Sequence, residues 1–186
     1  MSAATLFRHN DFREGRWRNG RGVSWDIASD RPGDVIDWRL AIARIDSDVP
    51  FSHYPGIDRI FTLIEGAGLS LDVAGAGVLP VPEPFVPIYF SGDADCTSTL
   101  VNGPCRALNL FLRRGVLGAR VIIHDGGGAT SVGHAGDTLL FVLRGSGRLG
   151  DAILGLEDAA RINGPAQMVL TPDAALYEAH LLAPSA

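Results

Sequence analysis

Short runs in which apolar and polar residues alternate, each closed by glycine or proline, constrain this chain more than any other feature. In residues 107–113 leucines alternate with alanine, asparagine and phenylalanine, which is the two-residue period of a half-buried β-strand. The 186 residues include 23 glycines and 11 prolines, which favour many turns over long helices. We therefore expect an all-β protein, with further strands or strand-and-turn segments at residues 23–28, 37–45, 59–65, 88–90, 96–101, 116–124, 138–144, 152–163, 168–170 and 176–182.

Residues 51–66 carry the most informative charges. Pro55-Gly56 predicts a turn, and residues 59–65 then predict a strand. On an ideal strand Arg59 and Glu65 share one face with two apolar side chains. A charged residue in that position is paired, meets a ligand, or lies at a strand end in water. The sequence leaves these three alternatives open.

Other polar residues on or beside predicted strands have two interpretations each. Arg39 shares a strand face with two alanines, so it pairs with a carboxylate or faces a ligand. Asn109 is opposite a row of leucines and needs hydrogen-bond partners, either in a loop or in a ligand. Trp17 and Asn19 precede Gly20 and form either a binding mouth or a simple β-turn.

Composition excludes several classes of function. The net charge is −5 with a pI near 5.4, and no basic run is present, so nucleic acid is not an expected partner. No apolar stretch is long enough to span a membrane, and residues 1–10 lack the pattern of a signal peptide, so we expect a cytoplasmic protein. All 16 basic residues are arginine, which excludes a lysine nucleophile or Schiff base. Cys96 and Cys105 are expected to be free thiols on neighbouring strands.

Several motifs suggest chemistry that their context does not favour. The glycine pattern from Gly145 to Gly150 matches a dinucleotide fingerprint, but no helix follows, so we interpret it as a hairpin turn. His124 and His134 flank a glycine-rich loop, and solvated loop residues are the default over a metal site. Ser52 and His53 are adjacent and point apart on a strand, which makes them a poor nucleophile–base pair.

Six separate pieces, in order, resemble the HutD/Ves family of bacterial proteins over about residues 7–115. Residues 116–186 fit more loosely, and paired glycines near residues 66–68 and 145–147 form a faint internal repeat. The matching pieces are Trp17-Arg-Asn-Gly-Arg-Gly22, Asp37-Trp-Arg-Leu-Ala-Ile-Ala43, Phe51-Ser-His-Tyr-Pro-Gly-Ile-Asp-Arg59, Leu63-Ile-Glu-Gly-Ala-Gly-Leu69, Phe90-Ser-Gly-Asp93 and the segment from Asn102-Gly-Pro104 through Asn109 to Gly115.

The resemblance implies a bicupin, with a first cupin-like lobe at residues 1–115 and a second at residues 116–186. Proteins similar to HutD are associated with histidine utilisation and are thought to bind a pathway intermediate, such as urocanate or formylglutamate, and to restrain flux. The resemblance assigns no firm reaction, and the metal-binding motif of cupins is absent, so we expect neither a metal nor another cofactor.

We therefore expect a metal-free protein that binds a small carboxylate, and a homodimer is compatible with this expectation. The forked guanidinium group of arginine can donate two parallel hydrogen bonds to one carboxylate. One alternative is an isomerase or hydrolase of a small acid that uses Glu65 or His53, and the other is a structural or protein-binding bicupin in which Arg59 and Glu65 form a buried pair. The expected ligand-binding residues are Trp17, Asn19, Arg39, Tyr54, Arg59, Glu65 and Asn109.

Overall fold

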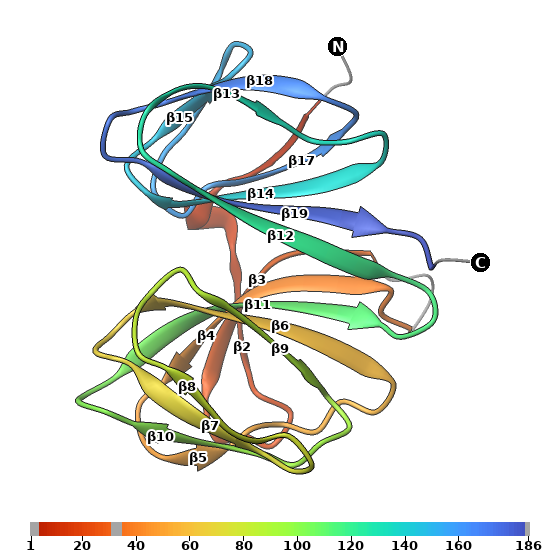
Figure 1. Cartoon of the computed structure of the whole chain (residues 1–186), viewed down its shortest axis with the longest axis vertical. Coiled ribbons are helices and arrows are strands. Elements are labelled where there is room, and N and C mark those ends of the chain that lie inside the picture. Colours follow the sequence, from red (N-terminus) through yellow and green to blue (C-terminus); the bar gives the residue numbers. More distant parts are fainter. Residues whose placement is uncertain (1–3, 31–34, 185–186) are drawn as a thin grey trace. The chain divides into compact units, whose positions relative to one another are not determined.

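The computed structural model describes residues 4–30 and 35–184, and nearly all regular structure in this part of the chain is β-strand (Figure 1). The chain divides into two compact units, one of residues 13–116 and one that joins residues 4–12 to residues 117–184. The described residues contain one 3-10 turn, η1 (His9–Asp11), and no helix long and apolar enough to cross a membrane.

The N-terminal unit, residues 13–116, consists of two antiparallel sheets. The larger has the strand order β2-β3-β4-β11-β6-β9, and the smaller has the order β5-β10-β7-β8. The strands are β2 (Arg13–Arg16), β3 (Val23–Asp30), β4 (Trp38–Ile45), β5 (Val49–Pro50), β6 (Ile57–Glu65), β7 (Leu69–Val73), β8 (Gly77–Val81), β9 (Pro87–Ser91), β10 (Cys96–Leu100) and β11 (Cys105–Arg113).

The other unit repeats this plan with fewer strands. Its sheets have the orders β1-β17-β14-β19-β12 and β13-β18-β15-β16. The strands are β1 (Thr5–Phe7), β12 (Gly118–Asp125), β13 (Gly128–Val132), β14 (Asp137–Arg144), β15 (Gly147–Leu149), β16 (Ala152–Leu154), β17 (Ala159–Asn163), β18 (Ala166–Leu170) and β19 (Ala175–Leu182).

Each unit has its own core between its two sheets. In the N-terminal unit Phe61 and Leu63 of β6 pack in one cluster with Leu71 of β7. In the other unit Leu140 and Leu176 pack with strands of the smaller sheet. The alternation seen in the sequence therefore places one face of each larger sheet inside its own unit.

The structure differs from the sequence expectation at the chain start and in residues 75–87. The first lobe was expected to span residues 1–115, but β1 pairs with β17, with Leu6 opposite Ala160, so residues 4–12 belong with residues 117–184. Residues 1–3 and 185–186 of the expected lobes lie outside the described residues. The glycine- and proline-rich residues 75–87, where no strand was expected, contain β8, which pairs with β7.

The hairpin interpretation of the glycine pattern at residues 145–150 is confirmed. Strands β15 and β16 pair antiparallel, with Leu149 opposite Ala152, and Gly150 has a positive φ of 58° in the turn between them. No helix follows these glycines in the described chain up to residue 184, so the segment lacks the helix N-terminus on which a dinucleotide phosphate would bind.

Candidate functional site

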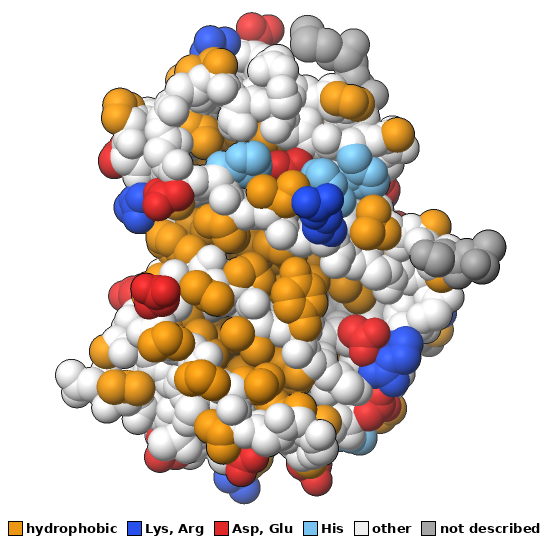
Figure 2. Space-filling view, viewed as in Figure 1, with side chains coloured by type: hydrophobic (Ala, Val, Ile, Leu, Met, Phe, Trp, Pro, Cys, Tyr) orange, Lys and Arg blue, Asp and Glu red, His pale blue; other side chains and the backbone are white. Residues whose placement is uncertain are grey.

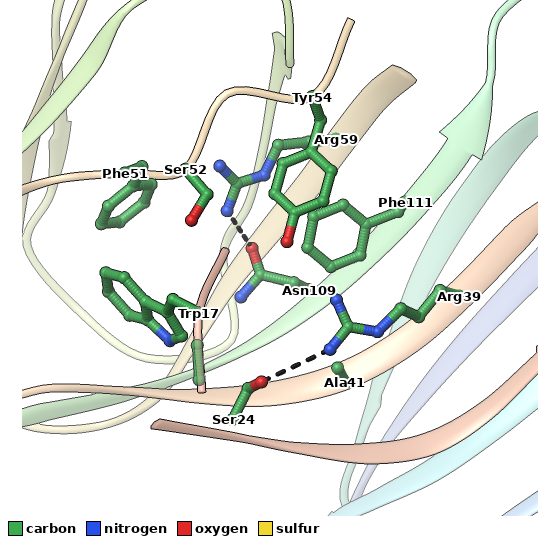
Figure 3. Close-up of a pocket in the computed structure, with 11 residues that line it drawn as sticks. Trp17, Ser24, Arg39, Ala41, Phe51, Ser52, Tyr54, Arg59, Asn109 and Phe111 are labelled. Atoms are coloured by element: carbon green, nitrogen blue, oxygen red, sulfur yellow. Dashed lines mark hydrogen bonds between the residues drawn. The ribbon is translucent and has the colours of Figure 1, made fainter. Parts of the chain in front are cut away.

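A cavity of about 30 Å³ lies inside the N-terminal unit against the larger sheet (Figure 3). A single bound water needs roughly 10–15 Å³ by the same measure, so the cavity has room for a group of a few non-hydrogen atoms. Its lining combines two arginines, three small polar side chains and four aromatic rings: Trp17, Ser24, Arg39, Ala41, Ala43, Phe51, Ser52, Tyr54, Arg59, Asn109 and Phe111.

Strand register explains why space exists at this point. Asn109 on β11 lies opposite Ala41 on β4 and opposite Phe61 on β6. Directly opposed residues share a sheet face, so the short side chains of Ala41 and Ala43 leave room beside Asn109. The two alanines that share a strand face with Arg39 thus leave space beside it, and a cavity occupies part of that space.

Arg59 is the most unusual residue of the cavity, because its charge is buried without a carboxylate. The residue is 6% exposed, and its Nη2 donates to Asn109 Oδ1 over 2.7 Å. Among the residues that the structure describes, no carboxylate pairs with Arg59, and its buried Nε has no hydrogen-bond partner. Burial lowers the pKa of Arg59 to about 10, so the guanidinium remains charged at neutral pH.

Aromatic rings surround this guanidinium. Its central carbon lies 5.0 Å from the ring centre of Phe51, 4.9 Å from that of Phe90 and 5.1 Å from that of Phe111. Such contacts attract the cation through the negative face of each ring. They hold the charge in place but offer no hydrogen-bond acceptor, so the Nε–H of Arg59 stays without a partner beside the cavity that Arg59 lines.

Arg39 also lines the cavity, but its charge is already compensated. Its Nε donates to Asp26 Oδ1 over 2.6 Å, and its Nη2 approaches Ser24 Oγ at 3.4 Å (Figure 3). Pairing with a carboxylate was one of the two sequence interpretations of Arg39, and the structure shows that pairing. Arg39 therefore contributes less free positive charge to the cavity than Arg59 does.

The turn at residues 17–22 forms one wall of the cavity. The indole Nε1 of Trp17 donates to the Val23 carbonyl over 3.0 Å, and its ring packs edge-on against Phe51. A Cβ on Gly22 would lie only 2.4 Å from the Trp17 ring, so glycine is required for this packing. Trp17 therefore contributes a rigid wall to the cavity.

Asn19, one of the expected ligand-binding residues, is exposed and does not line the cavity. Its Nδ2 donates to the Pro50 carbonyl over 2.8 Å, and its backbone N–H donates to Ser52 Oγ over 3.3 Å. Its Oδ1 accepts from the backbone N–H of Arg21. These bonds tie the turn to residues 50–52, so Asn19 positions the wall.

Tyr54 is buried, lines the cavity and packs 4.9 Å from the Phe111 ring. Its backbone N–H donates to the Gly92 carbonyl over 2.8 Å, and the Gly92 N–H donates to the Ile57 carbonyl over 2.7 Å. A Cβ on Gly92 would lie 2.7–2.8 Å from the carbonyl oxygens of Ile57 and Tyr54. The position of this wall thus depends on a glycine outside the cavity.

Glu65 and His53 lie outside the cavity. The register of β11 against β6 shifts between Arg106 and Ala107, and Glu65 falls at the exposed end of its strand. There it pairs with Arg106 over 3.1 Å, with its side chain 65% exposed. The expected shared face with Arg59, and the buried Arg59–Glu65 pair of the structural alternative, are therefore wrong. His53 is exposed, with Nε2 2.6 Å from the Asp93 carbonyl oxygen.

Sequence reasoning named five of the lining residues and missed the others. Phe111 shares the predicted alternating face with Asn109, so the strand pattern could have included it. Phe51 and Ser52 belong to the stretch that was already identified as informative, but they precede the predicted strand and carried no periodic signal. Ser24 lies on β3, and only the pairing of β3 with β4 brings it to the cavity.

Comparisons with known proteins agree on one family. The pattern of the HutD family matches residues 9–177 of this chain. The chain is 35% identical to a 21.2 kDa protein in the hutC 3′ region of Pseudomonas putida over 129 residues, which are 68% of this chain and 67% of that protein. It is 33% identical to protein Ves of Citrobacter koseri over 148 residues, 77% of this chain and 75% of Ves.

The solved structure of HutD from Pseudomonas fluorescens SBW25 is similar over 97% of this chain and 100% of that one, with a TM-score of 0.82 and 28% identity. AerE from Microcystis aeruginosa, at 10% identity and a TM-score of 0.69, shares the cupin-like fold. On the family match and these relatives, the chain is a member of the HutD family.

Proposed function

We propose that this protein is a metal-free bicupin whose N-terminal unit binds a small carboxylate related to formylglutamate or urocanate, and that it thereby regulates histidine utilisation. The observation that carries the binding site is the buried guanidinium of Arg59. It faces a cavity, has a neutral amide as its hydrogen-bond acceptor and lacks a carboxylate partner among the described residues. A carboxylate in the cavity would supply the missing negative charge through charge-assisted hydrogen bonds.

Cavity size limits how such a ligand would bind. A volume of about 30 Å³ accommodates a carboxylate group but not a whole formylglutamate. The carboxylate therefore enters beside Arg59 and Asn109, and the remainder of a longer acid extends past Trp17 and Tyr54. The P. fluorescens HutD structure is described as a formate condition, and formate is the smallest carboxylate.

The lining residues also explain why binding is proposed without a metal and without turnover. Arginine, asparagine, serine and aromatic groups supply hydrogen-bond donors and walls, but the lining has no histidine, cysteine or carboxylate. The acid–base candidates Glu65 and His53 lie outside the cavity. The link to histidine utilisation rests on the hut-related names of the relatives in the two Pseudomonas species.

The experiment is calorimetric titration and thermal shift of the purified protein with formate, formylglutamate, urocanate and histidine, each with and without EDTA. We expect at least one carboxylate to bind and to raise the melting temperature equally in both conditions, because a ligand of the folded state stabilises it by mass action. Arg59→Met should abolish this effect, and Arg21→Met, which changes an exposed arginine, should preserve it. Full affinity in the Arg59→Met protein would overturn the proposal.

The regulatory role requires a separate test in cells. In a bacterium that carries this gene, Arg59→Met should change transcript levels of the histidine-utilisation genes during growth on histidine to the same extent as deletion of the gene. Transcript levels equal to those of the unaltered strain would separate ligand binding from regulation and would remove the regulatory part of the proposal.

A further inference from the structure

A polar cluster in the unit that contains residues 117–184 is already satisfied by its own members. The buried carboxylate of Glu178 lies 2.5 Å from His124 Nε2 and 2.7 Å from His180 Nε2. It also accepts the Gly133 N–H over 2.5 Å, and no group of described side chains could hold a metal ion. His124 thus pairs on β12, so the expectation that it is a solvated loop residue is wrong. Figure 2 shows histidine side chains at the surface of this unit.

In the N-terminal unit, by contrast, an exposed arginine lies next to the cavity without lining it. Arg18 is exposed, and its guanidinium carbon lies 5.1 Å from the ring centre of Tyr54. The Tyr54 ring is a wall of the cavity, close to the Arg59 guanidinium (Figure 3). Arg18 therefore extends the positively charged surface from the cavity wall toward solvent.

The turn that carries Arg18 is anchored on both sides of this residue. The indole of Trp17 donates to a backbone carbonyl of β3, and the side chain of Asn19 donates to a backbone carbonyl of β5. The contact with Tyr54 restrains the Arg18 guanidinium itself. A side chain that is restrained before binding loses less conformational entropy when it binds, so Arg18 is partly preorganised.

Arg18 and Arg59 are two positive charges near one ring. Their guanidinium carbons lie 5.1 Å and 5.9 Å from the Tyr54 ring centre, so the sum of these distances, 11.0 Å, is the upper limit of their separation. A carboxylate carbon lies roughly 4 Å from the guanidinium carbon in a forked pair. The carboxyl carbons of a five-carbon diacid lie up to about 5 Å apart. Such a diacid therefore reaches both arginines.

Two other arginines near the cavity are less suited to a second carboxylate. The Nε of Arg39 already donates to Asp26 Oδ1 over 2.6 Å, so its charge is compensated. Arg21 lies on the same turn as Arg18 and is also exposed, but among the described contacts its guanidinium stacks on no cavity ring. In the part of the chain that the structure describes, no carboxylate pairs with Arg18.

We propose that Arg18 binds the second carboxylate of a short diacid whose first carboxylate pairs with Arg59. This inference rests on the proposed function and narrows its ligand class. The cavity accommodates one carboxylate, and the remainder of the acid leaves it past Trp17 and Tyr54, where Arg18 lies. Two cations along one ligand favour two anionic groups over one. Formylglutamate is a diacid and urocanate has one carboxylate, so the site prefers formylglutamate.

The test is calorimetric titration of the full chain with two probes that differ in one terminal group, glutarate and its monoamide glutaramate, and with formate as the reference. We expect the unaltered protein to bind glutarate about five- to tenfold more tightly than glutaramate, because hydrogen bonds between two charged groups are stronger. Arg18→Met should reduce this ratio to within about twofold and affect formate far less than glutarate. Arg21→Met, which removes the same charge from the same turn, should keep the ratio.

Circular dichroism verifies the folding of each variant, and the comparison of glutarate with glutaramate in the unaltered protein needs no variant. Equal affinity for these two probes, or a ratio that Arg18→Met leaves intact, would overturn the inference. In either case, formate binding that Arg59→Met abolishes would retain the proposed function. Failure of both formate and glutarate to bind would overturn the proposed function and this inference with it.

Discussion

Replacing Asn109 with leucine should destabilise the ligand-free protein, and adding Arg59→Met to that variant should restore part of the lost stability. Asn109 Oδ1 is the acceptor for the buried guanidinium. Its removal leaves the Arg59 charge with aromatic contacts alone. Removing one partner of a buried charged hydrogen bond is costly, whereas replacing both partners with apolar groups of similar size is often nearly neutral.

The structure sets the magnitudes. Burial lowers the Arg59 pKa from 12.5 to about 10, and at about 1.4 kcal/mol for each pKa unit this corresponds to roughly 3 kcal/mol against the charged form at neutral pH. The hydrogen bond to Asn109 offsets part of this cost, and a bond to a charged group contributes about 1.5–3 kcal/mol. We therefore expect Asn109→Leu to lower the free energy of unfolding by about 2 kcal/mol.

The double variant removes the buried charge together with its contacts to the rings. It recovers roughly 3 kcal/mol from burial and loses about 1–2 kcal/mol of cation–π attraction. It should therefore be about 1–2 kcal/mol more stable than Asn109→Leu alone. Arg21→Met in the Asn109→Leu background is the matched control and should restore nothing, because Arg21 is exposed.

The assay is urea denaturation at neutral pH in a buffer free of carboxylates, with comparison of variants only where the denaturant slope is unchanged. A double variant less stable than Asn109→Leu would refute the reasoning, because the aromatic contacts would then outweigh the burial cost. In that case Arg59 would be a stabilising residue of the core, and its buried charge would no longer support a ligand site.

Three further predictions concern groups outside the cavity. A hydrogen bond from the Gly56 N–H is the largest of several causes that lower the pKa of Asp93 from 3.8 to about 2. The stability that Asp93 contributes is therefore present above about pH 4 and lost as the pH falls to 2. Asp93→Asn should make the urea midpoint fall less over that pH range, and an equal fall would contradict this prediction. Burial raises the pKa of the Cys96 thiol to about 11 and also raises the pKa of the Cys105 thiol. Neither cysteine should therefore react with a thiol reagent at neutral pH until the protein unfolds. Rapid labelling of the native protein would be inconsistent with their burial. Glu65→Gln should bind a carboxylate ligand with an affinity within about twofold of the unaltered protein, as measured by calorimetry. The exposed Glu65 side chain lies outside the cavity and pairs with Arg106, and surface ion pairs contribute only about 0–1 kcal/mol to stability. A large loss of affinity would place Glu65 in the site.

Much of the fold follows from local sequence pattern, because alternation and turn residues act over a few positions. The strand at residues 107–113 was predicted from its leucines and is part of β11. The short β8 was missed because it lies between glycines and prolines, and only its pairing with β7 stabilises it. The pairing of β1 with β17 joins residues more than 150 positions apart, which no local pattern reveals.

The sequence predicted those site residues that are charged or polar on an otherwise apolar strand face. Arg59 and Asn109 were identified because a charge or an amide on an apolar strand face needs a partner. Glu65 was misplaced because a register irregularity beside Arg106 moves the strand end, and ideal alternation cannot anticipate such a shift. Asn19 was expected to bind a ligand, but its side chain bonds to backbone groups, as a turn asparagine often does, and it does not line the cavity.

The neutral amide of Asn109 also imposes an evolutionary constraint. A change to aspartate replaces one NH₂ group with oxygen and alters the side-chain volume little. It would place a permanent counter-ion 2.7 Å from the Arg59 guanidinium, where the amide oxygen lies now. The positive charge of Arg59 would then be neutralised within every molecule, and the carboxylate at position 109 would repel an incoming anion. Under the proposed function, a conservative replacement at this position is a loss-of-function allele that still folds.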